Sequence, residues 1–505
     1  MIKGMDARME ADVVVVGAGP AGIHAALAAA RGGADTVLVE RYGFIGGMST
    51  AALVYPWMTF HTTDGKQVIK GSAQEMVDRL MAAGASPGHV RDTCGFVYTI
   101  TPFHPEKYKV IAVDMLREAG VRMLFHSFVD GVETDGDAIR SVTLTGKSGR
   151  IRLAAKMFVD TSGDADVAHL SGAPCLMGRD GDRMTQPMTM KFRMHGVDLE
   201  EVKRYILAHP DEFYRKTPID ELPDLPLTAV QGFYKHWKEA GLPINRDQVL
   251  FFSGPEPDEV LVNMTRVQGL DATNVEDLTA AETEGRRQVL MVADFMVKSL
   301  PGFRNASISQ VGAQIGVRES RRIAGLYTLD MDDVVEGRRF DDVVARSGYP
   351  IDVHAPSDKG VIVSWIKGDG AYDIPYRCLV PQKINNLLVG GRCISTTHEA
   401  LGTTRLSPSC MATGQAAGTA AALFFQQAKK IFGRPRIQPN KRLVHNIYIR
   451  TAKKPDHQHH FLPHAFGETS RQQVARVSHA ELLQQRCSFP LKRGLVHSIY
   501  GSNQP

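Results

Sequence analysis

The sequence predicts an α/β fold in which a parallel β-sheet with covering helices is interrupted by an inserted α+β domain. The first observation is the stretch from Val13 to Arg41, where an apolar run, a glycine-rich turn, an alanine-rich segment and a second apolar run follow one another. That order is typical of a strand, a helix and a second parallel strand. Buried strands followed by small residues appear again at 157–164 and, after a long interruption, at 386–391. At 505 residues the chain also exceeds what one hydrophobic core usually fills.

The glycine-rich turn has the G-x-G-x-x-G spacing of a dinucleotide-binding site. Gly17 permits the sharp turn, Gly19 leaves room for a pyrophosphate, and Gly22 allows the helix to pack closely on the strand. Pro20 stands where the helix begins, and the missing N–H of proline costs nothing there. The free N–H groups at this helix end favour phosphate binding.

The second strand ends in Glu40, which lies 18 residues after Gly22. This is close to the ~20-residue offset of a carboxylate that accepts ribose hydrogen bonds, and such a carboxylate repels the 2′-phosphate of NADP. The segment RYGFIGGMST follows, and Gly46 and Gly47 expose backbone N–H groups in it. We interpret it as a second loop against the cofactor, with a plain turn as the alternative.

Composition indicates an ordinary globular protein. Hydrophobic residues make up 43% and charged residues 23% of the chain, and the net charge is only +4, so we expect no nucleic-acid partner. Apolar runs fall short of the ~18 residues of a membrane helix, which predicts no membrane segment and a cytoplasmic location. The six cysteines form no C-x-x-C pair, so the sequence predicts neither a disulfide framework nor a metal site.

The segments between these motifs also show helix and strand patterns. Residues 1–10 are expected to be a disordered leader. Helices are predicted around 75–81 and 105–119, and strands at 121–132, 138–144 and 151–159. Four residues before the first of these helices either line a pocket or belong to ordinary packing: Tyr55, Trp57, Thr59 and His61.

The strand at 157–159 runs into VDTSGDADVAHLSGAP, whose small residues leave room for a ligand at the strand end and lead into a short helix. The composition changes at 177–369, which we interpret as the inserted domain, with an amphipathic helix over 280–300. Within it, GAQIGVRESRRIAG gathers Arg318, Glu319, Arg321 and Arg322. A solvated, ion-paired turn is the favoured interpretation, and an anion-binding cluster is the alternative.

Residues suited to cofactor binding or catalysis appear again after residue 371. A strand at 386–389 is followed by Gly390, Gly391 and Arg392, then by a loop with His398 and Arg405, and then by a helix over 409–425. The positive end of that helix favours electron-rich oxygens such as those of a reduced flavin. After residue 431 a histidine-rich tail is predicted to be disordered rather than metal-binding.

These segments together resemble the FAD-dependent oxidoreductase family, flavoproteins with two dinucleotide-binding domains that are distant relatives of succinate dehydrogenase and fumarate reductase flavoprotein subunits. The motifs GAGPAG with Glu40, IGGMST, VDTSGDADVAHLSGAP, IGVRESRRI and VGGRCISTTHEALGTTRLSPSCMATGQAAGTAAAL occur in the family's order over about residues 11–430. The resemblance implies a Rossmann-like FAD-binding domain in two parts, 11–176 and 370–430, around an inserted substrate domain, 177–369. The remaining residues, 431–505, are an atypical tail.

The resemblance also implies contacts with FAD, residue by residue. The residues concerned are Gly17, Gly19, Pro20, Gly22, Glu40, Arg41, Gly46, Gly47, Met48, Thr161, Gly163, Asp164, Gly391, Arg392, Gly414 and Gln415.

The predicted function is that of an FAD-dependent oxidoreductase, which transfers a hydride between flavin N5 and a small organic substrate and also uses an electron acceptor of unknown identity. Arg318, His398 and Arg405 are the candidate catalytic residues, because arginine binds a carboxylate with both oxygens and histidine moves protons near neutral pH. Structural roles for His398 and Arg405 are the alternative. Alternative functions are a flavin monooxygenase, although no second dinucleotide site is visible, and a flavin-bound RNA-modifying or partner-binding protein.

Overall fold

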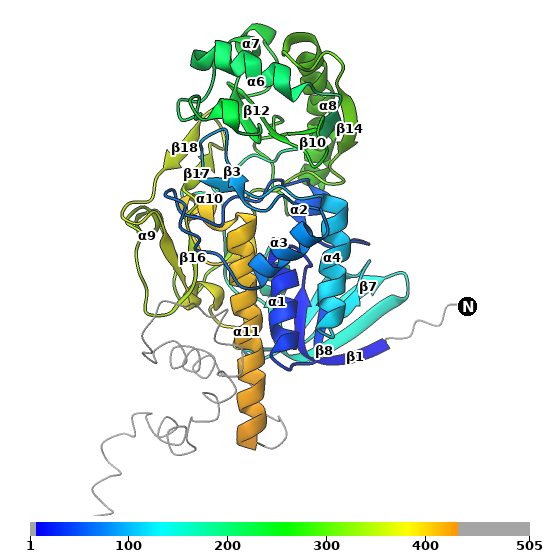
Figure 1. Cartoon of the computed structure of the whole chain (residues 1–505). Coiled ribbons are helices and arrows are strands. Elements are labelled where there is room, and N and C mark those ends of the chain that lie inside the picture. The colour runs from blue at the N-terminus through cyan, green and yellow to red at the C-terminus, as the bar shows by residue number, and fades with distance from the viewer. Residues whose placement is uncertain (1–6, 433–505) are drawn as a thin grey trace, which may run out of the picture.

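A mostly parallel sheet forms the base of the larger part of the molecule (Figure 1). The computed structural model describes residues 7–432. In the sheet, β5 (Arg122–Leu124), β2 (Thr36–Val39), β1 (Ala7–Val16) and β8 (Gly149–Asp160) are parallel neighbours. The other edge of β8 pairs with the antiparallel β7 (Ala138–Gly146) along its first half and with the parallel β20 (Leu387–Val389) along its last residues. The strand β6 (Phe128–Asp135) completes the sheet beside β7.

The first strand is longer than the sequence predicts. Residues Ala7 to Ala11 pair in register with Ile151 to Ala155 of β8, so the prediction of a disordered leader over 1–10 is wrong from Ala7 onward. The backbone of this extension is held by the sheet, while its charged side chains, such as Arg8 and Glu10, stay exposed. A search for apolar runs therefore does not reveal this extension of the strand.

Two helices, α1 (Pro20–Arg31) and α11 (Ser407–Phe432), pack side by side against this sheet (Figure 1). Their backbones almost touch, since a Cβ added at Gly414 or at Gly418 would lie 2.0 Å from the carbonyl oxygen of Ala21 or of Ala25. The alanines and glycines of the two helices allow this close approach. α11 begins at Ser407, two residues before the predicted start.

Further helices and short strands cover the same part of the molecule. The helices predicted near 75–81 and 105–119 are α3 (Ser72–Ala82) and α4 (Pro105–Glu118), and the short helix after β8 is α5 (Asp166–Leu170). The other small elements are α2 (Met48–Ala51), β3 (Val90–Arg91) and β4 (Thr99–Ile100).

A five-stranded antiparallel sheet forms the upper part in Figure 1 and has its own hydrophobic core, made of residues between Met188 and Val317. This core lies within the predicted 177–369 segment. Its strands, in spatial order, are β11 (Ala229–Gly232), β12 (Val249–Ser253), β13 (Val260–Val262), β10 (Phe192–His195) and β14 (Ser307–Val311). The helices are α6 (Leu199–Ala208), α7 (Tyr234–Ala240) and α8 (Val275–Ser299), the last of which confirms the helix predicted over 280–300.

The segment from 318 onward returns to the larger core, to which Ile323, Ile351 and Tyr372 contribute. It holds three two-stranded pairings, β15 (Arg321–Ile323) with β9 (Cys175–Met177), β16 (Val343–Ser347) with β19 (Tyr372–Pro375), and β17 (Ile351–His354) with β18 (Val361–Ser364). Its helices are α9 (Met331–Val335) and α10 (His398–Thr404), and it has short 3₁₀ turns at Tyr376–Leu379 and Gly391–Cys393. Two further 3₁₀ turns, Pro210–Glu212 and Leu222–Asp224, lie in the part with the antiparallel sheet.

The loop predicted between His398 and Arg405 is instead the helix α10, which ends at Thr404. Thr397 caps it, since its hydroxyl oxygen accepts a hydrogen bond from the Ala400 amide at 3.3 Å. The helix is short and buried except at Glu399, so the sequence shows no amphipathic pattern there.

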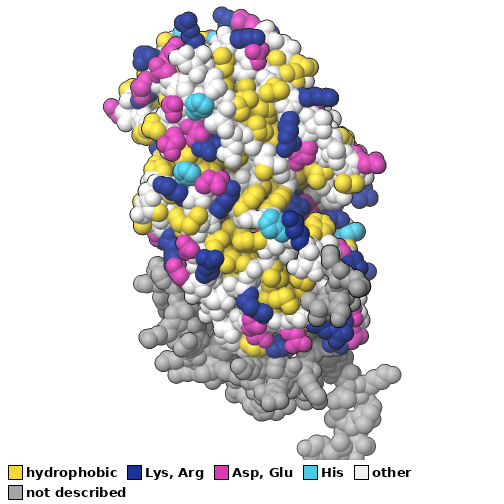
Figure 2. Space-filling model, turned by 90° about the vertical axis from the view of Figure 1, so that its right-hand side faces the viewer, with side chains coloured by type: hydrophobic (Ala, Val, Ile, Leu, Met, Phe, Trp, Pro, Cys, Tyr) yellow, Lys and Arg dark blue, Asp and Glu magenta, His cyan; other side chains and the backbone are white. Residues whose placement is uncertain are grey.

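The face drawn in Figure 2 mixes charged side chains of both signs with hydrophobic ones. Within residues 7–432, no helix combines the length and apolar character that crossing a membrane requires. The predictions for the tail after residue 432, including its histidines, lie outside the described residues.

Candidate active site

One large cavity lies where the tips of β1, β2, β8 and β20 meet the underside of the antiparallel sheet. It encloses about 1630 Å³ of space free of atoms, open solvent included. Thirteen of the residues singled out from the sequence line it: Gly17, Gly19, Pro20, Glu40, Arg41, Gly47, Met48, Thr161, Gly163, Arg318, Gly391, Arg392 and Arg405. The parallel strand ends and the inserted sheet therefore share one site.

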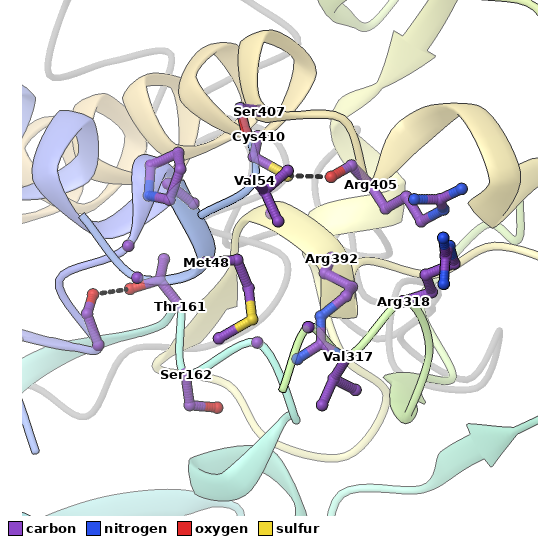
Figure 3. Close-up of a pocket in the computed structure, with 18 of the residues that line it drawn as sticks. Met48, Val54, Thr161, Ser162, Val317, Arg318, Arg392, Arg405, Ser407 and Cys410 are labelled. Carbon is purple, nitrogen blue, oxygen red and sulfur yellow. Dashed lines mark hydrogen bonds between the residues drawn. The ribbon is translucent and has the colours of Figure 1, made fainter. Parts of the chain in front are cut away.

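The glycine turn after β1 forms a narrow backbone cradle at one end of the cavity. A Cβ at Gly17 would lie 2.5 Å from the Thr161 carbonyl oxygen, and one at Gly47 would lie 2.7 Å from Cα of Gly19. The Thr161 hydroxyl donates to the carbonyl oxygen of Gly17 at 2.8 Å (Figure 3). The N-terminus of α1 begins at this cradle without a side-chain cap, so its N–H groups remain available to an anion.

Glu40 lies at the tip of β2, lines the cavity and is only 4% exposed. Its Oε2 accepts a hydrogen bond from the Ala18 amide at 2.7 Å, and its Oε1 accepts one from the Tyr42 amide at 3.0 Å. Burial raises the pKa of Glu40, while these backbone amides and Arg41 oppose the rise. Each carboxylate oxygen keeps a lone pair for a hydroxyl group in the cavity.

Behind the cavity wall, Asp164 positions Arg392. Its Oδ1 lies 2.7 Å from the Arg392 guanidinium and accepts a hydrogen bond from the Ser320 hydroxyl at 2.6 Å. Burial disfavours the charged carboxylate, but Arg392 and Arg41 outweigh this and lower the pKa of Asp164. Asp164 is absent from the cavity lining, and it acts through Arg392, which does line it.

Several predicted cofactor residues support the cavity without lining it. Gly22 packs against Gly17, because a Cβ there would lie 1.7 Å from the Gly17 carbonyl oxygen, and Gly46 packs beside Thr50. Gly414 provides the close approach of α11 to α1. Gln415 accepts hydrogen bonds from the amide and hydroxyl of Ser72, at 3.0 and 2.7 Å, and so joins α11 to α3.

Arg318 reaches the opposite end of the cavity from the segment after β14. Its guanidinium donates to the carbonyl oxygen of Pro187 at 2.6 Å and to the hydroxyl of Thr189. Burial, followed by the nearby cations Arg405 and Arg246, lowers its pKa. Figure 3 draws the side chains of Arg318 and Arg405 on the same side of the cavity. This cation has no bidentate carboxylate partner among the described residues.

Arg405 stands at the C-terminal end of α10, immediately before α11. Its Nη2 lies 3.2 Å from the Asp352 carbonyl oxygen and 3.6 Å from Asp352 Oδ2, while its buried Nε has no hydrogen-bond partner in the described chain. The Tyr349 hydroxyl donates to the same carboxylate at 3.1 Å. Arg405 lines the cavity, and a guanidinium whose nearest carboxylate oxygen is 3.6 Å away is suited to a small anion.

His398 lies outside the cavity. Its Nδ1 is 2.8 Å from Oε2 of Glu319, and the other carboxylate oxygen of Glu319 pairs with Arg322. Burial alone would raise the pKa of Glu319, but His398 and Arg322 lower it. This buried network supports the structural alternative for His398. It also corrects the interpretation of the 318–322 cluster as a solvated turn, because Glu319 and Arg322 are buried and Arg318 lines the cavity.

The end of the cavity near Arg318 also contains residues that the sequence analysis missed. Lys191, Asn263, Tyr349, Asp352 and His354 all line it. The alternating segment Met188–Phe192 was the available signal for Lys191, because every second side chain of an extended chain shares a face. Of the four uncertain residues near 55–61, Tyr55 lines the cavity, whereas Trp57, Thr59 and His61 do not.

Comparison with known proteins decides the family. The sequence profile of the family described as FAD dependent oxidoreductase matches residues 12–432. The chain belongs to this family. The protein is therefore an enzyme of the oxidoreductase class and uses FAD.

Individual relatives are more distant. A urocanate reductase from Eggerthella lenta is 40% identical over 82 residues, which are 16% of this chain and 13% of that protein. Among solved structures, the flavin-dependent brominase Bmp2 is 13% identical, with a TM-score of 0.46 and coverage of 88% of this chain and 84% of its own. The p-nitrophenol 4-monooxygenase PnpA from Pseudomonas putida is 12% identical, with a TM-score of 0.43 and coverage of 93% and 97%.

The residues present fit an FAD molecule. A Cβ at Gly391 would lie 2.8 Å from Cβ of Ala21, so side chains are excluded where the tip of β20 meets α1. Glu40 presents acceptors for ribose hydroxyls at the tip of β2, and the N-termini of α1 and α11 reach the same cavity through Pro20 and Ser407.

Proposed function

We propose that this flavoenzyme transfers a hydride between the flavin and a small organic anion, whose carboxylate binds between Arg318 and Arg405. The observation that carries the proposal is the pair of buried guanidinium groups at the end of the cavity opposite Glu40. Arg318 has neutral hydrogen-bond acceptors, and the carboxylate oxygen of Asp352 lies 3.6 Å from the Arg405 guanidinium. A carboxylate would supply both charge and acceptors in a region of low dielectric.

In this proposal, residues at one end of the cavity bind FAD and residues at the other end bind the substrate. The backbone at Gly17, Gly19, Pro20 and Gly47 holds the pyrophosphate, and Glu40 accepts ribose hydrogen bonds. The remaining lining residues that the sequence singled out for FAD, namely Arg41, Met48, Thr161, Gly163, Gly391 and Arg392, complete the binding site. Bound FAD supplies the acceptor or donor of the hydride at its ring system.

Arg318 and Arg405 orient the substrate, and their neighbours keep them in place. Thr189 and the Pro187 carbonyl fix Arg318, while Asp352 fixes Arg405 from one side. Because the guanidinium groups are already held, a substrate carboxylate binds without a large loss of side-chain freedom. Arg318 is buried, so the low local dielectric strengthens this charge interaction.

Anaerobic bleaching of the bound flavin tests the proposal. The purified yellow protein is mixed with matched pairs of compounds that differ only in a carboxylate, such as lactate against 2-propanol and alanine against ethylamine. We expect bleaching, or a shift of the flavin absorption bands, by the carboxylates alone. Equal responses to both members of every pair, or a response to neither, would contradict the anionic substrate.

A further inference from the structure

Lys191 brings an amine into the substrate end of the cavity. The chain from Met188 to Phe192 is extended, so its side chains alternate between two faces. Met188, Met190 and Phe192 pack into the core of the antiparallel sheet, whereas Thr189 and Lys191 line the cavity. Since Thr189 accepts a hydrogen bond from Arg318, Lys191 stands on the same face as the residue that anchors this arginine.

The Lys191 amine is buried without a counter-ion. The side chain is 8% exposed, and within residues 7–432 the contact recorded for its Nζ is the ring of Phe252, with its centroid at 5.9 Å. The charged groups that face it are all cations, namely Arg318, Arg405 and Arg246. Burial, followed by these three cations, lowers the pKa of Lys191 to about 7. A buried lysine without a partner exchanges its proton readily near neutral pH.

Other titratable groups at this end are less suited to exchanging a proton. Burial and Asp352 hold the pKa of the Tyr349 phenol well above its usual value, and its hydroxyl already donates to Asp352. Burial and the surrounding arginines hold the pKa of His354 well below its usual value, so this ring stays neutral. Asp352 faces Tyr349, His354 and Arg405, and its carboxylate is therefore engaged.

We propose that Lys191 is the acid–base residue of the substrate end, and that it exchanges the proton which accompanies hydride transfer. This inference rests on the function proposed above. It further specifies the substrate as a carboxylate whose neighbouring carbon carries a hydroxyl or an amine, because Lys191 lines the cavity two residues after Thr189, which holds the carboxylate-binding Arg318. One proton must move for every hydride, and no other side chain described at this end offers an amine.

In the oxidative direction the substrate contains the unit H–C–X–H, where X is oxygen or nitrogen. The C–H bond breaks and its hydrogen leaves with both electrons to the cofactor. The X–H bond breaks, its electron pair forms the C=X bond, and the proton moves to the neutral Nζ of Lys191, which becomes an ammonium group. The reductive direction returns the same proton and hydride. Because the ammonium is surrounded by arginines, the proton leaves to solvent before the next oxidation.

The first test measures the titration of Lys191 in the full-length, flavin-loaded protein. Trace acetic anhydride is applied across a pH series from about 6 to about 10, and mass spectrometry follows the acetylation of each lysine peptide. Exposed Lys298 provides the internal reference for reagent reactivity. We expect the reactivity of Lys191 to rise around pH 7. A rise together with the exposed lysines, or no labelling at any pH, would overturn the proposal, because a proton-exchanging amine must be neutral and reachable.

The second test compares Lys191→Met with the surface control Lys298→Met in anaerobic bleaching by lactate, malate, alanine and glutamate. We expect Lys191→Met to retain its flavin, to bleach about a hundredfold more slowly, and to lose the pH dependence near 7. Bleaching of the wild type with an unchanged rate in Lys191→Met would overturn this inference and leave the proposed function standing. If these acids fail to bleach the wild type, the proposed function itself fails and the role of Lys191 fails with it.

Discussion

The two ends of the cavity are built in different ways. At the cofactor end, backbone groups of consecutive residues form the wall, as at Gly17 and Gly19, and the acid Glu40 follows within one βαβ unit. At the substrate end, side chains from distant segments converge, and Lys191, Arg318 and Arg405 come from three different parts of the chain. The cofactor end therefore depends on close backbone packing, whereas the substrate end depends on buried charge.

The substrate end is also the less stable arrangement. Its cations outnumber its acids, and Lys191 and Arg405 Nε lack partners among the described residues. At the cofactor end, by contrast, Glu40 and Asp164 are each held by hydrogen bonds or an ion pair. Unpaired buried charge costs free energy unless a ligand supplies the partner. This difference can be tested by separating flavin retention, substrate response and stability.

The largest effect is expected at the backbone cradle. In Gly17→Val, the new side chain would collide with the Thr161 carbonyl, and the glycine has a φ of +95° that valine does not tolerate. We expect colourless protein, measured as the flavin absorbance per protein after purification. Gly360→Ala is the control, since its Cβ meets nothing within 4 Å. A yellow Gly17→Val protein would show that the cradle is not the cofactor site.

Arg318→Met is expected to impair the response to the substrate without affecting flavin binding. Loss of a buried charged partner costs about 2 to 5 kcal/mol, so bleaching by carboxylates should slow on the order of a hundredfold or more. Flavin content should remain that of the wild type. Arg286→Met, at an exposed position of α8, is the matched control. An unchanged bleaching rate would remove Arg318 from substrate binding.

Lys191→Met should stabilise the fold in a pH-dependent way. The pKa of Lys191 falls from 10.5 to about 7 on folding, so between these values the unfolded chain binds more protons than the folded one. The stability contributed at Lys191 is therefore present above about pH 10.5 and is lost as the pH falls to about 7. We expect the melting temperature of Lys191→Met to exceed that of the wild type most at pH 7, and the gain to shrink toward pH 10. A gain independent of pH would contradict the assigned titration.

His398→Leu is expected to act on stability alone. Glu319 would lose one buried partner, at a cost of about 1 to 3 kcal/mol, while the cavity stays intact. The unfolding midpoint in urea should fall, and the bleaching rate per bound flavin should stay the same. His195→Leu, at the exposed end of β10, serves as the comparison. Slower bleaching at full flavin content would restore His398 as a catalytic candidate.

Glu40→Gln should produce the smallest effect, a weaker retention of FAD. The amide keeps one acceptor for the Ala18 N–H but loses the charge-assisted bonds to ribose, worth about 1 to 2 kcal/mol. Equilibrium dialysis should show a dissociation constant raised about tenfold. Bleaching of the flavin that remains bound should be unaffected. Unchanged retention would reject the ribose contact.

Local sequence patterns were sufficient for most of the parallel sheet. Runs such as Val13–Val16 and the glycine turn after them contain their own strand, turn and helix signals, because these depend on neighbouring residues. The extension of β1 to Ala7 was missed, since pairing with β8 holds a stretch whose side chains are polar. The helix α10 was missed because it is short and almost entirely buried, so it lacks an amphipathic pattern.

The two ends of the cavity were also unequally predictable. Motif spacing located Gly17, Glu40 and Gly391, whose neighbours in the chain reveal their surroundings. Lys191 and His354 gained their significance only through tertiary packing, which buries them among arginines from other segments. Arg318 was named as a candidate from its residue type, whereas its place in the cavity and the burial of the adjacent Glu319 outside it follow from tertiary packing.

The contact between α1 and α11 has a consequence for how the protein is made. The tip of β20 forms one wall of the glycine cradle, and α11 packs against it. Both elements lie almost four hundred residues after the cradle in the sequence. During translation, the contact between α1 and α11 cannot form until Gly418 has left the ribosome, and the glycine turn stays exposed until then. We therefore expect flavin binding to come late in synthesis, and chains that end before α11 to lack the cofactor.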